Sequence, residues 1–154
     1  MRMPTPPAIS DAEWEVMQVL WESAPLTANE VVDRVAGRRG WNPRTVKTLL
    51  NRLVKKGALG FEQEGNRYRY FPLASREACV RSESRSFLAR VFGGAVGPML
   101  AHFVNEAPLS PEELRHLREV LDRRVAGGRR RHSGLPNQPA EKTATETRTR
   151  RKEK

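Results

Sequence analysis

The segment from Asn42 to Gly57 is the part of the sequence that most restricts the fold. Asn42 is a good helix N-cap, Pro43 is pre-shaped for the first helical position, and Gly57 suits the residue that follows a helix. At about 100° per residue, the large apolar residues of this predicted helix fall on one side. They are Val46, Leu49, Leu50 and Leu53. A helix with one apolar side has to pack on other elements, so we expect a small helical domain around it.

The opposite side of the same helix is basic. From Asn42 to Lys56 the sequence has five Lys or Arg and no Asp or Glu, whereas solvated helix faces usually mix the two. If such a helix binds DNA, residues near its start suit contacts with the edges of the DNA bases, and cations further along suit contacts with the DNA phosphates. The candidates for base contacts are Arg44, Thr45, Lys47 and Thr48, with Asn51 on the same side. The candidates for phosphate contacts are Arg52, Lys55 and Lys56. A merely solvated helix face is the alternative.

Two further helices and a hairpin are predicted around this helix. Capping boxes at Ser10 and Thr27 start a helix that runs to about Glu22 and a short helix that Gly37 stops. After Gly57, residues 58–63 and 67–71 alternate as two strands joined by residues 64–66. Helix, short helix, basic helix and hairpin is the element order of a winged helix-turn-helix.

The predicted wing carries two more cations. Arg67 and Arg69 share one face of the second strand because side chains alternate with a period of two. In a winged fold they are candidates for contacts with DNA phosphates or with the minor groove. The alternative is that they only keep the hairpin soluble.

The sequence after the hairpin returns to helical spacing. Three apolar clusters from Ser75 to about Arg124 predict three short helices, separated near Gly93 and near Pro108. These helices form no compact unit alone, and a second copy of the chain is the simplest partner. The candidate dimerisation residues are Phe87, Leu88, Val91, Phe92, Met99, Leu100, Phe103, Leu117 and Leu121. The alternative is that the helices fold back on their own winged domain.

The fold class is therefore mainly α with a small β-hairpin wing. We expect a disordered lead over residues 1–9, a winged helix-turn-helix DNA-binding domain over 10–73, a three-helix dimerisation domain over 74–125 and a disordered basic tail over 126–154. The tail holds nine Lys or Arg against three Asp or Glu, and the whole chain has a net charge of +10. Such a balance favours nucleic acid or an anionic surface as partner.

The remaining composition narrows the function. Cys79 is the only cysteine, which excludes an intramolecular disulfide, fits a reducing cytoplasm and predicts a packing residue. No stretch is long and apolar enough for a membrane span, so we expect no membrane insertion. The sequence has no Gly-rich phosphate loop, no metal-ligand cluster and no nucleophile–base pair. We therefore expect no catalytic residue, no cofactor and no metal.

The sequence resembles the BlaI/MecI/CopY penicillinase-repressor family over about residues 9–124. The resemblance is carried by SDAEWEVM at 10–17, VLW at 19–21, LT at 26–27, WNPRTVKTLLNRLVKKG at 41–57 and YFP at 70–72. Looser similarity follows at Glu83-Ser84, Ser86 to Leu88, Phe92 to Gly94 and Phe103-Val104. The resemblance implies a homodimer that binds double-stranded operator DNA with palindromic symmetry and represses transcription.

The resemblance also implies a control step. Resistance repressors of the family are cleaved at an Asn-Phe bond in the dimerisation domain, and a membrane sensor peptidase causes this cleavage. The aligned pair here is His102-Phe103, so this candidate cleavage bond departs from the family pattern. The copper-responsive branch has a C-terminal cysteine pair motif, and the tail here has no cysteine.

Two functions remain after these exclusions. The first is a dimeric, sequence-specific repressor acting on a promoter operator. The alternative is a non-specific nucleic-acid-binding protein driven by the basic tail. They differ in salt response, because non-specific binding depends almost wholly on counterion release.

Overall fold

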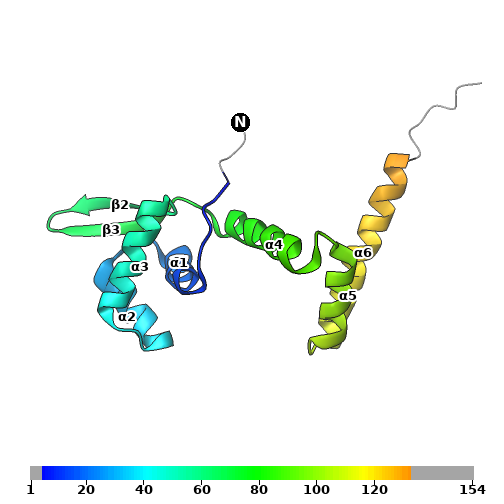
Figure 1. Ribbon diagram of the computed structural model, residues 1–154, viewed down its shortest axis with the longest axis horizontal. Helices are drawn as coiled ribbons and strands as arrows, with labels where there is room; N and C mark the ends of the chain where they lie inside the picture. The colour runs from blue at the N-terminus through cyan, green and yellow to red at the C-terminus, as the bar shows by residue number, and fades with distance from the viewer. Residues whose placement is uncertain (1–4, 133–154) are drawn as a thin grey trace, which may run out of the picture. The chain divides into compact units, whose positions relative to one another are not determined.

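In the computed structural model, which describes residues 5–132, the chain is built from six helices and three short strands (Figure 1). The elements in order are α1 (Asp11–Ser23), β1 (Leu26–Thr27), α2 (Ala28–Arg39), α3 (Pro43–Lys56), β2 (Leu59–Glu64), β3 (Arg67–Pro72), α4 (Arg76–Phe92), α5 (Val96–Glu106) and α6 (Pro111–His132). The described residues divide into two compact units, one ending at Asn105 and the other beginning at Glu106. The predicted class, mainly α with a small wing, is confirmed.

The starts of the first three helices follow local chemistry, as predicted. In α1 the Ser10 hydroxyl accepts from the Glu13 amide at 3.2 Å, and the Glu13 carboxylate accepts from the Ser10 amide at 3.0 Å. Thr27 forms the same capping box at α2. Asn42 caps α3, its side-chain oxygen accepting from the Arg44 amide at 2.8 Å. Each cap satisfies amides that a helix start leaves without partners.

The α2 helix ends two residues later than predicted. The helix continues through Gly37 to Arg39, and Gly40 ends it in the left-handed conformation with φ +65°. A glycine inside a helix costs only about 1 kcal/mol. The last turn is held to α1, where Arg38 pairs with Glu22 at 2.7 Å and Arg39 pairs with Glu15. The expectation that Gly37 stops the helix was therefore wrong.

The sheet has three strands rather than the predicted two. Its order is β1-β3-β2, all antiparallel, with Leu26 opposite Tyr70 and Phe61 also opposite Tyr70. The turn contains only Gly65 and Asn66, with Gly65 at φ +62°, so Glu64 belongs to a strand and not to the loop. The two residues of β1 carry no alternation of their own, which is why the sequence pattern did not predict a strand there.

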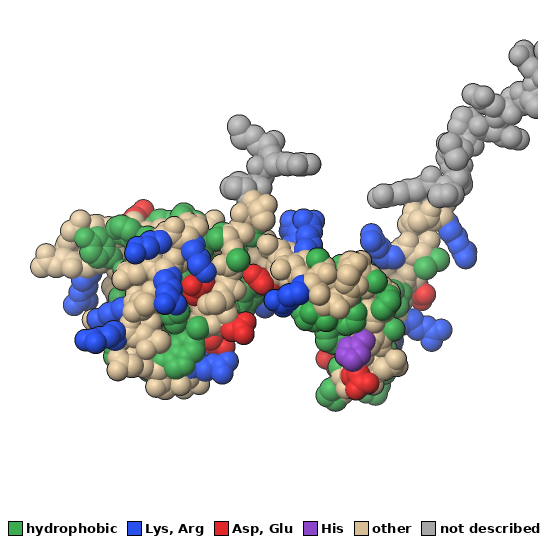
Figure 2. Space-filling view, in the orientation of Figure 1, with side chains coloured by type: hydrophobic (Ala, Val, Ile, Leu, Met, Phe, Trp, Pro, Cys, Tyr) green, Lys and Arg blue, Asp and Glu red, His purple; other side chains and the backbone are tan. Residues whose placement is uncertain are grey.

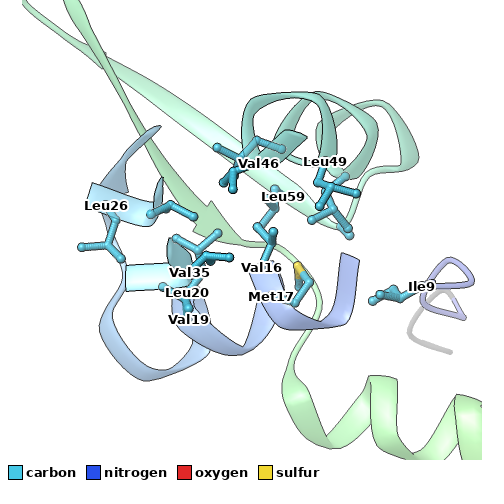
Figure 3. Packing of buried hydrophobic residues seen from close by; sticks show 14 of the residues in the cluster. Ile9, Val16, Met17, Val19, Leu20, Leu26, Val35, Val46, Leu49 and Leu59 are labelled. Atoms are coloured by element: carbon cyan, nitrogen blue, oxygen red, sulfur yellow. The ribbon is translucent and has the colours of Figure 1, made fainter. Parts of the chain in front are cut away.

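The three helices of the winged domain enclose its core (Figure 3). Val16, Met17 and Leu20 of α1 are fully buried against α2 and α3. Leu59 of β2 and Leu26 of β1 bring the sheet into the same cluster. This core fixes α3 along one side and leaves its other side free.

The lead before α1 was predicted to be disordered through residue 9. Residues 1–4 lie outside the described residues, but Ile9 is only 7% exposed and belongs to the core. Ile9 directly precedes the cap residue Ser10, a position where an apolar side chain commonly packs against the first turns of the helix.

The later helices are far less buried than the winged domain. Cys79 is the only residue of α4 to α6 that the structure buries fully within residues 76–129, and it joins the winged core, as its predicted packing role requires. The α6 helix continues through residues 126–132, where a tail was expected, because each residue added to an existing helix gains a hydrogen bond. The rest of the predicted tail, residues 133–154, lies outside the described residues.

The helices were also compared with the dimensions of a bilayer. Among residues 5–132, no single helix is both long and apolar enough to cross it. Only α4 and α5 taken together, across a bend of 92°, reach the required length and composition.

Candidate nucleic-acid interface

The α3 helix divides into an apolar and a basic face, as the sequence predicts. Val46, Leu49, Leu50 and Leu53 are at most 5% exposed and lie in the core. The structure places every predicted contact residue of this helix in solvent, namely Arg44, Thr45, Lys47, Thr48, Asn51, Arg52 and Lys55. Lys and Arg side chains accordingly spread over the winged part of the molecule in Figure 2. The core thus holds α3 with its polar face turned outward.

Four cations on this face are not neutralised by the protein. In the described part of the chain, no carboxylate lies within ion-pair distance of Arg44, Lys47, Arg52 or Lys55. An exposed helix face with several unpaired cations creates a positive potential that attracts polyanions. This distinguishes α3 from an ordinary solvated helix, whose cations find acidic neighbours.

The first three turns of α3 also form a shallow hollow. It is lined by Arg44, Thr45, Thr48, Leu49 and Arg52. The Thr48 hydroxyl donates to the Arg44 carbonyl oxygen at 2.9 Å, so its proton is used inside the helix while its oxygen can still accept. Two guanidinium groups beside small side chains suit the edge of a base or a phosphate oxygen.

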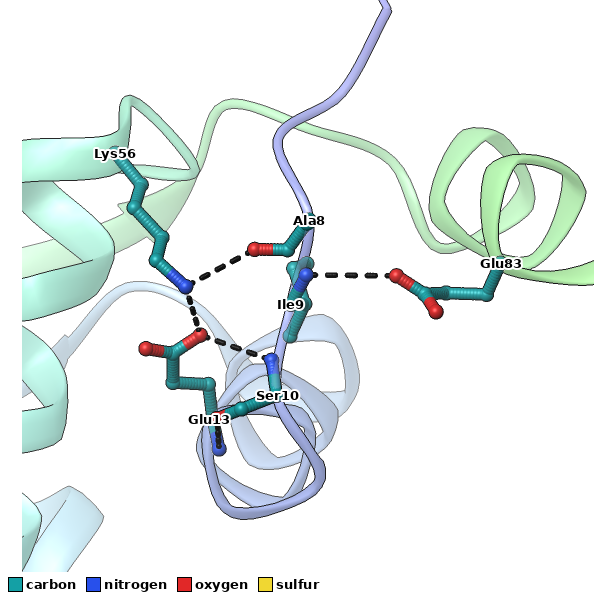
Figure 4. Close-up of polar contacts among 6 residues, drawn as sticks. All are labelled: Ala8, Ile9, Ser10, Glu13, Lys56 and Glu83. Carbon is teal, nitrogen blue, oxygen red and sulfur yellow. Dashed lines mark hydrogen bonds and ion pairs between the residues drawn. The ribbon is translucent and has the colours of Figure 1, made fainter. Parts of the chain in front are cut away.

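Lys56 does not belong to this face, contrary to its predicted role as a phosphate clamp. Its ammonium donates to the Glu13 carboxylate at 2.6 Å and to the Ala8 carbonyl oxygen at 3.0 Å (Figure 4). Glu13 is only 2% exposed. Burial raises the pKa of Glu13, but the hydrogen bonds from Lys56 and Ser10 outweigh it and leave the pKa below its ordinary value. The partly exposed lysine thus balances a buried carboxylate.

The two wing arginines differ in their surroundings. Arg67 is exposed, whereas Arg69 is half-buried and pairs with Glu64 at 2.9 Å. The register places Glu62 opposite Arg69 and Glu64 opposite Arg67. Residues opposite each other on paired strands share a face, so this side of the wing holds as many acids as bases. Arg67 is therefore the better placed of the two for a DNA phosphate.

The predicted dimerisation residues of α4 and α5 lie around three phenylalanines. The ring centroids of Phe87, Phe92 and Phe103 lie 6.0 to 6.4 Å apart, which is contact range for aromatic rings. Despite these contacts, Phe103 is 46% exposed. Leu88 and Met99 are half-buried, and Val91 and Leu100 are exposed. A large part of this cluster is thus left facing water by the single chain.

The second unit shows the same feature on α6. Leu117 is half-buried and Leu121 is exposed, and both were predicted to take part in dimerisation. An apolar hollow on this helix is lined by Leu109, Glu112, Glu113, His116 and Leu117. Each unit therefore carries apolar side chains without a partner of its own.

The candidate cleavage bond, His102-Phe103, lies inside α5. His102 is exposed, and its ring lies near those of Phe92 and Phe103, with centroids 6.1 and 5.8 Å away. Proteases favour exposed loop tips, so a cut here would require part of α5 to unwind. Elsewhere, no group of three His, Cys, Asp or Glu within the described residues is arranged to hold a metal ion.

The ion pair between the buried Glu13 and Lys56 was not predicted from the sequence. The Ser10 capping box did place Glu13 correctly, but its burial depends on the end of α3, 43 residues further along the chain. A basic run at the end of a predicted helix gives no sign of which cation turns inward.

Several known proteins are similar to this chain over most of its length. The family model described as penicillinase repressor matches residues 9–123. A penicillinase repressor of Bacillus licheniformis is 38% identical over 116 residues, which cover 75% of this chain and 91% of that protein. The methicillin resistance regulatory protein MecI of Mammaliicoccus sciuri is 31% identical over 75% of this chain and 94% of its own length. A solved structure of monomeric Bacillus licheniformis BlaI with the blaP half-operator is 41% identical, covers 47% of this chain and 89% of that chain, and superposes with a TM-score of 0.43.

Proposed function

Because the chain belongs to the penicillinase repressor family and is a DNA-binding transcriptional repressor, we propose that it acts as a homodimer on a palindromic promoter operator. Each copy contributes one α3 helix, which lies in the major groove of one half-site. The partners are thus double-stranded operator DNA and a second copy of the chain, and the site of action is the cytoplasm. We assign no enzymatic activity, since the relatives are by name a penicillinase repressor and a methicillin resistance regulatory protein.

The observation that carries this proposal is the exposed face of α3. Four unpaired cations lie on it, and the opposite face is locked in the core by four apolar side chains. A helix held rigidly in this way can enter the major groove without reorganising the domain. Residues at its start then lie nearest the base edges.

Residues along α3 divide between two tasks. Arg44 and Lys47 are suited to guanine O6 and N7, and Thr45 and Thr48 can contact a thymine methyl group. Asn51 can pair with an adenine edge in the same groove. Arg52 and Lys55, nearer the end of the helix, are suited to phosphates, with Arg67 of the wing as a further phosphate contact.

Dimerisation is supported by the apolar surface of α4 to α6. Burying one Phe or Leu side chain contributes about 1.5–3 kcal/mol, so several exposed ones favour association strongly. A second copy supplies a matching surface through a two-fold axis. Such a dimer fits an operator with two-fold symmetry, whose half-sites recur about one helical turn apart.

Binding to two duplexes at two salt concentrations tests the function as a whole. The purified chain is titrated onto its own upstream promoter DNA and onto a scrambled duplex of equal length. We expect the promoter to keep its advantage at the higher salt concentration, because base contacts survive screening better than phosphate contacts. Equal binding to both duplexes, with equal loss in salt, would instead support the tail-driven alternative.

Two lysines of α3 provide a matched pair of variants. Lys47→Ala should reduce the ratio of promoter to scrambled affinity by about tenfold, because it removes a base contact. Lys55→Ala should weaken both duplexes alike and lower the slope of log affinity against log salt by about 1, because it removes a phosphate contact. The assignment of tasks fails where Lys47→Ala weakens both duplexes equally.

The basic segment after the family match supports binding of a different kind. A variant that lacks residues 126–154 should lose affinity for both duplexes and keep their ratio, because the segment carries charge rather than a base-contacting surface. Loss of the sequence preference on this deletion would contradict the proposal that α3 determines specificity. Control by a membrane sensor peptidase would act on α5 at His102-Phe103 and needs that helix to unwind first.

A further inference from the structure

A short segment before α1 connects α3, the proposed recognition helix, to α4 (Figure 4). We call residues 8–10 the N-terminal strap. The Ala8 carbonyl oxygen accepts from the Lys56 ammonium at the end of α3, at 3.0 Å. The next residue, Ile9, donates its amide to the Glu83 carboxylate of α4, at 3.4 Å. Neighbouring backbone groups of the strap thus contact the two helices whose relative direction matters most for DNA binding.

The strap is itself fixed in place. The Ile9 side chain is only 7% exposed and lies in the winged core. The Ser10 amide donates to the buried Glu13 carboxylate, and Ser10 caps α1. The strap is therefore fixed to the winged domain. The Ile9 amide that binds the Glu83 carboxylate does not move with α4.

The start of α4 is attached to the winged domain by contacts that do not involve the strap. The Trp21 indole donates to the Ala74 carbonyl oxygen at 2.9 Å, and the Leu73 amide donates to the Ala58 carbonyl oxygen at 2.9 Å. In the first turn, Cys79 is buried in the core. These contacts fix where α4 begins. Glu83 lies one turn further along, so its contact restricts the angle at which the helix leaves the domain.

Small changes in this angle have large effects at the far end of α4. The helix has 17 residues, which at about 1.5 Å per residue gives a length of about 26 Å. A tilt of about 8° displaces its far end by about 3.4 Å, the axial length of one base pair. In a two-fold dimer joined through α4 to α6, both copies tilt, so the separation of the two α3 helices changes by up to about twice that distance.

We propose that Glu83, held by the Ile9 amide, is a positioning residue that sets the half-site spacing the dimer accepts. The inference rests on the proposed dimer and palindromic operator. It adds a second source of specificity, since α3 selects the bases within a half-site and the strap contact selects the distance between half-sites. Glu83 itself contacts no DNA in this arrangement.

The test uses the full chain and a series of synthetic duplexes. The half-site is first selected from a random duplex library with the wild-type protein. It is then placed as an inverted repeat at the selected spacing and with one or two base pairs inserted or removed, and a single half-site serves as reference. The affinity of each variant for each duplex gives a spacing profile.

Three substitutions of Glu83 separate the effect of side-chain length from the effect of side-chain charge. Glu83→Ala and Glu83→Asp should lower the preference for the selected spacing roughly threefold to fivefold, because both lose the hydrogen bond. Glu83→Gln keeps the length and an acceptor oxygen, so its profile should match the wild type. Glu77→Ala, which removes a carboxylate from the same helix outside the strap contact, should also leave the profile unchanged. Half-site affinity and dimer mass should stay at wild-type values in all four variants.

The outcomes separate this inference from the proposed function. The positioning role alone is overturned by one combination of results. In it, the wild-type chain selects an inverted repeat, and the folded Glu83→Ala and Glu83→Asp dimers keep the wild-type spacing profile. A wild-type chain that selects no inverted repeat removes the palindromic dimer and the inference with it. Thermal unfolding of every variant shows that it is folded. If Glu83→Ala does not fold, the more conservative Glu83→Asp still decides the question.

Discussion

A single ion pair, between Glu13 and Lys56, accounts for the least expected chemistry of the winged domain. Glu13 is almost fully buried, and the side chain of Lys56 is 35% exposed. Removing the lysine leaves a buried carboxylate without its main partner. Partial exposure of the lysine limits the penalty, and we expect Lys56→Met to cost about 1–2 kcal/mol of unfolding free energy.

The same pair predicts how stability depends on pH. The pKa of Glu13 is lowered in the folded chain, where burial raises it but the Lys56 and Ser10 hydrogen bonds lower it more. A group with a depressed folded pKa stabilises the fold fully above its unfolded value, and this contribution is lost as the pH falls through the folded pKa. We therefore expect wild-type stability to drop below about pH 4.5, the ordinary value for a glutamate. Urea unfolding at several pH values should show a shallower drop for Glu13→Gln than for the wild type, with Glu77→Gln as control. Equal slopes for the wild type and Glu13→Gln would contradict the assignment.

Among the elements, the helices show how local signals determine a boundary. Gly57 follows α3 at φ +81°, whereas Gly37 lies inside α2 with ordinary helical geometry. A Cβ added at either position meets no atom within 4 Å. Gly57→Ala should therefore destabilise the chain by about 1–2 kcal/mol through its backbone conformation alone. Gly37→Ala should stabilise it by about 0.5–1 kcal/mol, because alanine is the better helix former. Denaturant melts of the two variants test this pair, and shifts of equal sign would refute the conformational explanation.

The sequence predicted those features of the elements that depend on neighbours within one turn. The caps at Ser10, Thr27 and Asn42, and the end of α3 at Gly57, are all of this kind. The two-residue strand β1 was missed because it exists only through its pairing with β3, more than 40 residues later. The continuation of α2 past Gly37 is likewise accompanied by ion pairs to α1, which are not local in the sequence.

The candidate site follows the same rule. Hydrophobic periodicity predicts the face that α3 exposes, because the buried face is determined by the helix itself. Which cations on that helix remain free is not a local property. Lys56 and Arg69 look equivalent to their neighbours in the sequence, yet Glu13 and Glu64 neutralise them in the fold. Cross-strand register and helix packing decide this, and neither can be derived from the spacing of residues in one segment.

For the whole molecule, the division between a buried and an exposed half is the main feature. The core lies almost entirely in the winged domain, and the described part of α5 and α6 contributes no fully buried residue. Exposed apolar side chains on these helices include Leu100, Val104 and Leu121. A domain of this size cannot gain much stability from so few buried groups, which is why we place the second copy there.

Two phenylalanines of similar exposure test where the chain associates. Phe103 on α5 is 46% exposed and Phe61 on the wing is 49% exposed. If the later helices form the dimer, Phe103→Glu should place a charge in the interface and convert the protein to monomers in sedimentation velocity. Phe61→Glu should leave the dimer intact, since the wing lies outside the proposed interface. Leu100→Glu, at 42% exposure, provides a second variant in case Phe103→Glu perturbs its contacts with Phe87 and Phe92.

Monomeric variants should keep half-site affinity and lose the advantage of the full operator, because two linked half-sites gain effective concentration. Dissociation by Phe61→Glu, with Phe103→Glu and Leu100→Glu still dimeric, would move the interface to the wing.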